Sequence, residues 1–425
     1  MLPDTATIGD QGQLLVGGCD TLELAAEFGT PLFVYDEAHL RARCTEAVEA
    51  FGDGVAYATK AFLCRAMAQL AHECGMQLDV ATAGELHVAL AAGVPADRLV
   101  MHGNNKSMAE LEMALTAGVG RIVVDSFDEL DRLDMLAARG IARQGDGGQG
   151  PARILLRMTP GIEAHTHEFV ATGQDDSKFG FTVSSGLAGK AVERAMASPA
   201  VELLGLHAHI GSQVFSIDSL RQSATIIAAM AAPYDLPELS VGGGLGVAYV
   251  DGEEGLTITQ WARVVKDAVA ATGCTAKVLA EPGRAIAAGA AITLYTVGTI
   301  KHLPDIRTYV AVDGGMSDNP RPVLYGSGYE TFLPRAVEAR RARTITVVGK
   351  HCESGDTLVR DGTVPDDIAV GDILATPVTG AYGYSMGSNY QHVLRPAVVF
   401  VADGEARQVV RRQTLDDLLR YDVAP

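Results

Sequence analysis

The sequence predicts an α/β protein that combines a (β/α)₈ barrel with a separate, mostly antiparallel β domain. Between residues 55 and 285, eight short apolar runs alternate with amphipathic helical patterns, which is typical of parallel strands covered by helices. After residue 290 strand-like runs follow one another with few helices between them. A chain of 425 residues also exceeds one ordinary compact core. We therefore expect the barrel at 36–289, and the β domain at 1–35 together with 290–425.

The eight expected barrel strands are 55–60, 77–81, 98–102, 121–125, 153–159, 202–210, 238–242 and 277–281. Helical patterns follow several of them, at 62–73, 83–92, 107–117 and 127–138. An open doubly wound sheet is the alternative fold for the same alternation. In a barrel, functional residues are expected at the C-terminal ends of the strands. Polar residues and glycines do gather there: Lys60, Asp79, His102, Asp125, Arg157, His209, Gly242, Gly243, Gly244 and Glu281.

The expected strands of the β domain are 291–300, 308–313, 344–349, 372–378, 397–402 and 407–411. Pro, Gly and Asp residues separate them, as they do in antiparallel sheets with short connections. The apolar stretch at 31–35 is expected to add one strand from the N-terminal end of the chain.

Composition narrows the classes of function. Hydrophobic residues make up 48% and charged residues 20% of the chain, which suits a soluble enzyme. The 34 basic and 52 acidic residues give a net charge of −18, so neither nucleic acid nor an anionic membrane is expected as a partner. No apolar run spans a membrane, and no secretory signal is visible. Six scattered cysteines indicate a reducing cytoplasm, and no metal-ligand motif occurs.

Lys60 ends a run that is apolar up to its last residue. Burial favours the neutral form of an amine, and a neutral amine is a nucleophile that can form a Schiff base. A lysine that only caps a strand is the alternative.

Three further groups lie at strand ends. The run Gly242-Gly-Gly-Leu-Gly246 allows backbone N–H groups to approach a phosphate, although tight turns use glycines as often. Glu281 is placed to hold a protonated ring nitrogen and Arg284 to bind a carboxylate, unless the two are an ordinary surface ion pair. His207 and His209 share one strand face. His209 is placed to stack on an aromatic cofactor and Ser212 to bind phosphate, although one histidine could be a core residue.

In the β domain, Cys352 stands beside a carboxylate in His351-Cys-Glu-Ser-Gly-Asp356 and is a candidate proton donor. A packing cysteine is the alternative. Further along lie the phenols of Tyr325 and Tyr382 and the guanidinium of Arg321. A barrel-end lysine, a glycine loop, a stacking histidine and a carboxylate for a ring nitrogen together describe a site for pyridoxal 5'-phosphate.

At this point the chain resembles the fold-type III pyridoxal phosphate decarboxylases, which have an alanine racemase-like barrel, and within them the diaminopimelate decarboxylase family. The resemblance runs from about residue 30 to 420 and rests on eight motifs in order. They are Tyr57-Ala-Thr-Lys-Ala61, His102-Gly-Asn-Asn-Lys106, His209-Ile-Gly-Ser-Gln213, Gly242-Gly-Gly-Leu-Gly246, Glu281-Pro-Gly-Arg284, Asp313-Gly-Gly-Met316, His351-Cys-Glu-Ser-Gly-Asp356 and Gly380-Ala-Tyr382.

The resemblance implies decarboxylation of meso-2,6-diaminopimelate to L-lysine, the last step of lysine biosynthesis, with a role for each matching residue. The implied catalytic residues are Lys60, which would anchor the cofactor, Cys352, which would deliver a proton, and His209. The implied cofactor-binding residues are Lys60, Asp79, His209, Ser212, Gly242, Gly243, Gly244, Glu281, Gly283, Arg284 and Tyr382. The implied substrate-binding residues are Arg284, Arg321, Tyr325, Glu353 and Tyr382. Cys352 and Glu353 would reach the site from the partner subunit, which implies a homodimer with shared active sites.

Three other functions compete with this prediction. A related decarboxylase acting on ornithine, lysine or another amino acid would want an acidic residue, rather than Arg321, at the distal end of the substrate. A racemase of the same fold would place an arginine where this chain has Glu281. A non-catalytic homologue would be expected to lose Lys60 or Cys352. The chain departs from the family pattern at Gly387 and Gln391, where many members have Ala and Asn, and this leaves substrate tolerance open.

Overall fold

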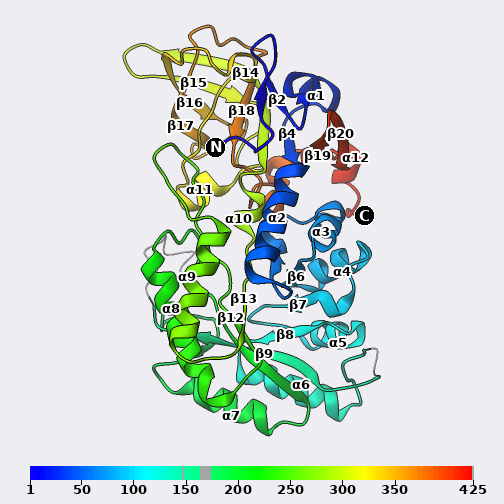
Figure 1. Ribbon diagram of the computed structural model, residues 1–425. Helices are drawn as coiled ribbons and strands as arrows, with labels where there is room; N and C mark the ends of the chain where they lie inside the picture. The colour runs from blue at the N-terminus through cyan, green and yellow to red at the C-terminus, as the bar shows by residue number, and fades with distance from the viewer. Residues whose placement is uncertain (146–147, 163–173, 424–425) are drawn as a thin grey trace. The chain divides into compact units, whose positions relative to one another are not determined.

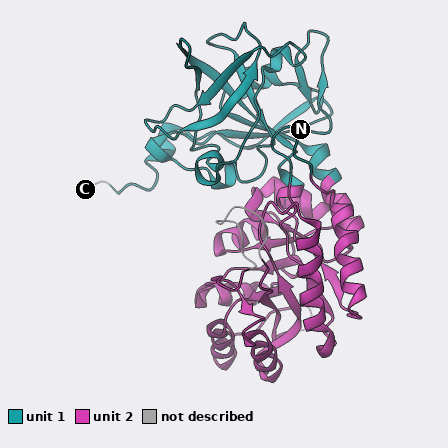
Figure 2. Ribbon diagram, turned by 90° about the vertical axis from the view of Figure 1, so that its left-hand side faces the viewer, with its two compact units in different colours: residues 1–42, 247–254, 286–425 teal, residues 43–246, 255–285 magenta. Residues whose placement is uncertain are grey.

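The computed structural model describes residues 1–145, 148–162 and 174–423, and the chain forms two compact units (Figures 1 and 2). The barrel unit comprises residues 43–246 and 255–285. The β unit comprises residues 1–42, 247–254 and 286–425, so it gathers segments from three parts of the chain.

Eight parallel strands build the barrel unit. In the order of their pairing they are β13 (Lys277–Leu279), β12 (Glu238–Ser240), β11 (Val201–Ala208), β9 (Ala152–Thr159), β8 (Arg121–Val124), β7 (Leu99–Met101), β6 (Gln77–Val80) and β5 (Ala56–Ala58). The Ala56 N–H donates to the Ala280 carbonyl at 2.9 Å, which brings the first strand to the end of the last. The nearly closed ring confirms the predicted barrel, and the open doubly wound sheet is wrong. A short strand, β10 (Phe181–Thr182), adds to β9.

Helices connect the barrel strands. They are α2 (Glu37–Phe51), which leads from the β unit into β5, and then α3 (Arg65–Glu73), α4 (Ala83–Ala91), α5 (Met108–Ala117), α6 (Phe127–Ala138), α7 (Leu187–Ala197), α8 (Ile217–Ala231) and α9 (Ile258–Ala271). Side-chain caps fix where several of them begin. Ser107 and Glu110 form a capping box at α5, and Thr257 and Gln260 form one at α9.

The interior of the barrel is packed with apolar side chains. One cluster draws one residue from each of five strands: Ala56, Val100, Val123, Leu155 and Leu279. A filled interior leaves the strand ends as the place for polar chemistry.

The main sheet of the β unit has eight strands. Its path is β17 (Thr357–Val364), β16 (Arg343–Val348), β15 (Arg307–Val312), β14 (Ala291–Leu303), β4 (Leu32–Asp36), β19 (Ala397–Ala402) and β20 (Glu405–Val410), with β18 (Ile373–Pro377) also on β14. β4 is the strand expected at 31–35, and it pairs antiparallel with β14 and parallel with β19. The other pairings are antiparallel except β15 with β16. The mostly antiparallel β domain is thus confirmed.

Smaller elements complete the β unit. They are the three-stranded sheet β1 (Thr7–Ile8), β2 (Leu14–Val16) and β3 (Cys19–Asp20), and the helices α1 (Thr21–Phe28), α10 (Arg284–Ala287), which begins in the barrel unit, α11 (Arg321–Tyr325) and α12 (Leu415–Leu418). Leu14 and Leu24 pack with Leu32, Ile292 and Val399 of the main sheet in one apolar core. Among the described residues, no helix combines the length and apolar character needed to cross a membrane.

Candidate active site

Four titratable side chains meet at the strand ends of the barrel unit. Nε2 of His207 lies 3.0 Å from Oε2 of Glu281, and Oγ of Ser240 donates to Oε1 of Glu281 at 2.7 Å. Nε2 of His102 lies 3.7 Å from Oε1 of Glu281 and 3.4 Å from Oδ1 of Asp79. Four different strands, or the residues that directly follow them, supply these groups.

The pKa values of the two carboxyl groups in this cluster, Glu281 and Asp79, are shifted in opposite directions. Burial alone would raise the pKa of Glu281, but the charge of His207 and the hydrogen bonds from His207 and Ser240 bring it below its usual value. Burial and the charge of Glu281 raise the pKa of Asp79 well above its usual value. Burial lowers the pKa of His102 to about 3. Glu281 is therefore the ionised member of the cluster, and Asp79 is the one that favours its proton.

The cluster could not be read from spacing along the chain. Ligating atoms of His102, His207 and Glu281 all lie within 4.8 Å of one another, which is also the spacing of a metal-ligand group. No short spacing in the sequence reveals this triad, because His207 lies in β11 while His102 and Glu281 follow β7 and β13, and the three meet only when the barrel closes.

The glycine loop after β12 fits closely between neighbouring strand ends. A Cβ on Gly242, Gly243 or Gly244 would lie 2.2 to 2.3 Å from a backbone carbonyl, and Gly242 and Gly244 have φ of 68° and 108°. The Gly243 N–H donates to Nδ1 of His209 at 3.2 Å, which fixes the orientation of the imidazole ring. Burial, and then the charge of Lys60, lower the pKa of His209 well below its usual value. A neutral, fixed ring beside bare backbone suits an aromatic ligand that carries an anionic group.

Ser212 and Arg284 are joined by a hydrogen bond from Nη2 of Arg284 to Oγ of Ser212 at 2.8 Å. Gly283, which precedes Arg284, has a packing requirement of its own. A Cβ at Gly283 would lie 2.9 Å from the carbonyl oxygen and the Cβ of Ala58, at the end of β5. Gly283 thus lets the residues after β13 approach the strand that leads to Lys60.

Lys60 lies in a 3₁₀ turn, Thr59–Ala61, just after β5. The expected burial does not extend to its side chain, which is exposed, because the chain leaves the barrel wall in this turn. Burial of the strand therefore does not predict the protonation state of the Lys60 amine. The positive charge of Lys60 lowers the pKa values of Asp79 and His209, so its ammonium lies within electrostatic range of both.

A different lysine at this end of the barrel is buried. Nζ of Lys106 donates to the carbonyl oxygens of Gly103 and Val123 at 2.6 and 2.7 Å and lies 2.7 Å from Oε1 of Glu129. Burial lowers the pKa of Lys106 and raises the pKa of Glu129. With all three donors engaged, Lys106 links the loop after β7 to β8 and α6 rather than serving as a nucleophile.

Asp125 and Arg157, also expected at strand ends, form a pair of their own. Nη1 of Arg157 lies 3.5 Å from Oδ2 of Asp125. The guanidinium of Arg157 also stacks over the ring of Phe179, 4.2 Å from its centroid.

The β unit holds the remaining candidates, and Arg321 is the most enclosed of them. Arg321 is 3% exposed, and its Nη1 donates to the hydroxyl of Tyr329 at 2.7 Å. Its guanidinium carbon lies 4.1 Å from the ring centroid of Tyr249. Sequence reasoning missed both tyrosines, because they belong to no motif and come from separate segments. Tyr325 ends α11, and Tyr382 has a positive φ of 61°.

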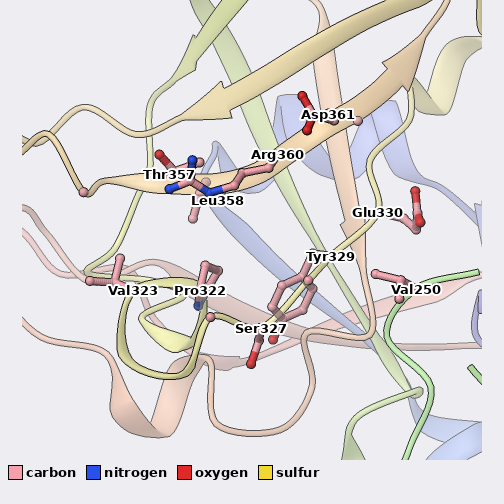
Figure 3. Close-up of a pocket in the computed structure, with 14 residues that line it drawn as sticks. Val250, Pro322, Val323, Ser327, Tyr329, Glu330, Thr357, Leu358, Arg360 and Asp361 are labelled. Carbon is pink, nitrogen blue, oxygen red and sulfur yellow. The ribbon is translucent and has the colours of Figure 1, made fainter.

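A pocket of about 350 Å³ lies between β17 and the chain around α11 (Figure 3). Tyr329, which binds Arg321, forms part of its wall together with Arg360 and Thr357. None of the predicted site residues lines it.

Cys352 and Glu353 lie in the turn between β16 and β17, and both side chains are exposed. The base of this turn is buried: Nδ1 of His351 lies 2.9 Å from Oδ2 of Asp356, and the Met316 N–H donates to Oδ1 of Asp356 at 2.7 Å. The rigid base and the exposed tip present the thiol and the carboxylate outward from the β unit.

Asp318, beside this turn, is a buried carboxyl group that makes stability depend on pH. Burial, and then the charges of Asp313 and Asp356, raise the pKa of Asp318 to about 7, although the Gly315 N–H donates to it. The folded chain then binds this proton more tightly than the unfolded chain does. The protonated Asp318 therefore contributes stability that is fully present below about pH 4 and is lost as the pH rises to about 7. This contribution to the free energy of unfolding is at most about 4 kcal/mol.

Asp318→Asn should remove this loss, because the amide still accepts the Gly315 hydrogen bond but does not ionise. Melting temperatures measured by calorimetry should match those of the wild type near pH 4 and exceed them increasingly up to pH 8. Asp366→Asn, at an exposed position, is the control. A difference that is constant across this range would contradict the assignment.

Comparisons with known proteins agree over the whole chain. The pyridoxal-binding domain of the pyridoxal-dependent decarboxylases matches residues 37–288. The diaminopimelate decarboxylase of Mycobacterium tuberculosis is 46% identical over 99% of this chain and 97% of its own length. That of Bacillus subtilis is 42% identical over 99% of this chain and 98% of its own length.

Solved structures agree as well. The diaminopimelate decarboxylase of M. jannaschii, in complex with L-lysine, superposes with a TM-score of 0.91 at 31% identity, covering 100% of this chain and 99% of that one. The Helicobacter pylori enzyme, also bound to L-lysine, gives a TM-score of 0.84 at 30% identity, covering 94% and 98%. The lysine/ornithine decarboxylase of Vibrio vulnificus, at 21% identity and a TM-score of 0.74 over 90% of this chain and 97% of that one, shares the fold.

Proposed function

We propose that this chain, which belongs to the pyridoxal-dependent decarboxylases, removes one carboxylate of meso-2,6-diaminopimelate as carbon dioxide and leaves L-lysine. The observation that carries the proposal is the agreement along the full chain with relatives named diaminopimelate decarboxylase, at 42% to 46% identity over 99% of its residues. The reaction is the last step of lysine biosynthesis.

The barrel unit fits pyridoxal 5'-phosphate. The glycine cradle at 242–244 has no room for side chains, and the ring of His209 is fixed next to it. Glu281 is held in its ionised form by His207 and Ser240, which is the form that pairs with a protonated pyridine nitrogen. When bound, the cofactor supplies a protonated ring that accepts the electrons of the breaking carbon–carbon bond.

Each residue of the barrel unit then has a definite task. Lys60 would supply the amine that holds the cofactor. Glu281 would pair with the protonated ring nitrogen, because His207 and Ser240 hold its carboxylate in the ionised form. Asp79, which favours its protonated form, lies 3.4 Å from Nε2 of His102, the same nitrogen that faces Glu281, so a second negative charge beside Glu281 is avoided. Ser212 and the glycines 242–244 bind the phosphate, and Gly283 keeps Arg284 close to β5.

The residues of the β unit bind the distal end of the substrate and deliver the proton. Arg321, buried and oriented by Tyr329 and Tyr249, binds the distal carboxylate together with Tyr325, and Arg284 contributes from the barrel unit. Tyr382 contacts cofactor and substrate. Glu353 binds the distal ammonium, and Cys352 delivers a proton to the carbon that loses its carboxylate.

We further propose a homodimer in which Cys352 and Glu353 complete the site of the partner subunit. Their exposed position at the tip of a turn with a rigid base supports this assignment. Residues 36–289 act as the cofactor domain, and 1–35 with 290–425 act as the domain that completes the site. A cytoplasmic location accords with the six cysteines, all of them described, which form no disulfide.

Carbon dioxide release in the presence of pyridoxal phosphate tests the function. We expect release from meso-diaminopimelate, with L-lysine as the product, and none from L-ornithine, L-arginine or L-lysine. The physical reason is the buried positive charge of Arg321, which attracts a distal carboxylate and repels the positively charged end of a diamine tail. Release from L-ornithine or L-lysine instead would retain the family and overturn the assignment of Arg321 and Tyr325 to a distal carboxylate.

A further inference from the structure

We infer that Tyr390 and Gln391 form a clamp that fixes the direction of Cys352 and Glu353, and that both are positioning residues for the reaction. The inference rests on the roles proposed above for Cys352 and Glu353. Neither clamp residue belongs to the motifs that carry the resemblance, and nothing in the proposed chemistry requires either of them to touch the substrate.

Two hydrogen bonds join the clamp to the turn. The hydroxyl of Tyr390 donates to Oε1 of Glu353, and Oε1 of Gln391 accepts the N–H of Cys352 at 3.0 Å. The hydrogen bond to the carboxylate of Glu353 raises the pKa of the Tyr390 phenol. One contact therefore orients a side chain and the other orients a backbone, so the two act on different parts of the same turn.

The ring of Tyr390 makes a third contact, with the residue before Cys352. It stacks on the imidazole of His351 with a centroid distance of 5.8 Å and an interplanar angle of 6°. His351 is itself held by Asp356 at the buried base of the turn. Tyr390 thus contacts both neighbours of Cys352 in the sequence while Gln391 binds Cys352 itself, and two residues hold three.

The clamp has a support of its own in the β unit. The Ser388 N–H donates to the carbonyl of Ser317 at 3.0 Å. Nδ2 of Asn389 donates to the carbonyl of Val393 at 2.9 Å and to Oε1 of Gln413 at 2.6 Å. These hydrogen bonds fix the segment that carries Tyr390 and Gln391. The two side chains therefore keep a defined direction toward the turn.

The backbone of the clamp is strained where it touches the turn. Gln391 has φ 53°, in the left-handed region that residues other than Gly, Asn, Asp and His rarely adopt, and the next residue, His392, has φ 56°. Both residues are exposed, so no packing in the core imposes this conformation. Strain held on an exposed segment whose side chains contact the turn that carries Cys352 and Glu353 is typical of a positioning element.

Two variants separate the two contacts. Tyr390→Phe keeps the stacked ring and removes the hydroxyl, so Glu353 loses its orientation: we expect KM for meso-diaminopimelate to rise about tenfold, with kcat changed less than about twofold. Gln391→Met removes the acceptor at similar length: we expect kcat to fall about tenfold with KM nearly unchanged, because only the proton donor is displaced. Gln391→Glu, which retains an acceptor oxygen, should recover most of kcat.

Two controls distinguish positioning from general damage. Tyr421→Phe, at a residue that is 86% exposed, should change neither constant. In a Glu353→Met background, Tyr390→Phe should add less than about twofold, because the acceptor of the hydroxyl has already been removed. Equal changes in kcat and KM in both clamp variants, or a full additional effect in the Glu353→Met background, would overturn the inference.

A second measurement does not depend on activity. Site-resolved hydrogen exchange should show the Cys352 amide exchanging about tenfold faster in Gln391→Met than in the wild type, and unchanged in Tyr421→Phe. Unchanged exchange at Cys352 would refute the clamp even if the wild type releases carbon dioxide. Faster exchange in a protein that releases none from meso-diaminopimelate would uphold the clamp and refute the proposed function, so the two failures are distinguishable.

Discussion

Lys60→Ala should yield a folded protein that has lost both the visible absorption of the bound cofactor and all detectable release of carbon dioxide. The side chain is exposed in a turn after β5, so truncation removes little packing, and the fold should persist. What is lost is the amine that we propose as the anchor of the cofactor. Added pyridoxal phosphate should therefore not restore turnover, because the covalent link has no other partner in this position.

Borohydride trapping followed by peptide mapping checks this expectation. The wild type should retain labelled cofactor on the peptide that contains Lys60, and Lys60→Ala should retain none. Lys190→Ala, an exposed lysine on α7, is the matched control and should keep both absorption and activity. Cofactor trapped on Lys106 in the variant would place the anchor elsewhere, although the three engaged donors and the buried pairing of Lys106 oppose this.

The barrel could be predicted because its strands are buried on both faces and so read as unbroken apolar runs. The ends of these runs were less certain for a physical reason. The run to Lys60 stays apolar through Thr59, but the strand ends at Ala58, where a 3₁₀ turn begins. Periodicity records burial, and Thr59 is buried in the turn as fully as in a strand. The same limit explains why the sequence suggested burial for Lys60 itself, which the turn brings to the surface.

β17 was missed because its sequence, Thr357–Val364, contains an Asp-Gly pair that is typical of a turn. In the structure Asp361 takes a positive φ of 53° inside the strand, and Gly362 packs against Thr331. The pair marks an irregularity within a strand, since the pairing of β16 with β17 shifts register at this point. Local composition alone does not separate the two cases.

The features of the site that could not be predicted from the sequence depend on contacts between distant segments. The motifs named Glu281 but could not show that Ser240 and His207 hold its charge, because neither distance nor hydrogen bonding is encoded in spacing. The enclosure of Arg321 by Tyr249 and Tyr329 was hidden for the same reason. Residue types at strand ends predict which chemistry is present, and only the folded chain shows which group is charged.

Isolated heterodimers of Lys60→Ala with Cys352→Ala should recover about half of the wild-type activity, although each variant alone is nearly inactive. Cys352→Ala by itself should keep its bound cofactor and lose about 10²- to 10⁴-fold in kcat, the usual contribution of a positioned proton donor. In the heterodimer one site combines an intact Lys60 with the partner's intact Cys352, while the other site lacks both. Chains carrying two different affinity tags, purified on both in turn, would supply the mixed species.

The matched control is a heterodimer in which one chain carries Lys60→Ala and the other carries Glu281→Ala, so that both substitutions lie in the barrel unit. Every site of that heterodimer contains a damaged barrel, so activity should stay absent even though the subunits pair normally. Recovery in the first pair and none in the second requires that the turn carrying Cys352 acts on a barrel of the other chain. The reverse outcome, an inactive Lys60→Ala and Cys352→Ala heterodimer, would mean that each chain completes its own site. The exposed thiol and carboxylate at the tip of that turn would then serve the chain that carries them, and pairing would have no part in catalysis.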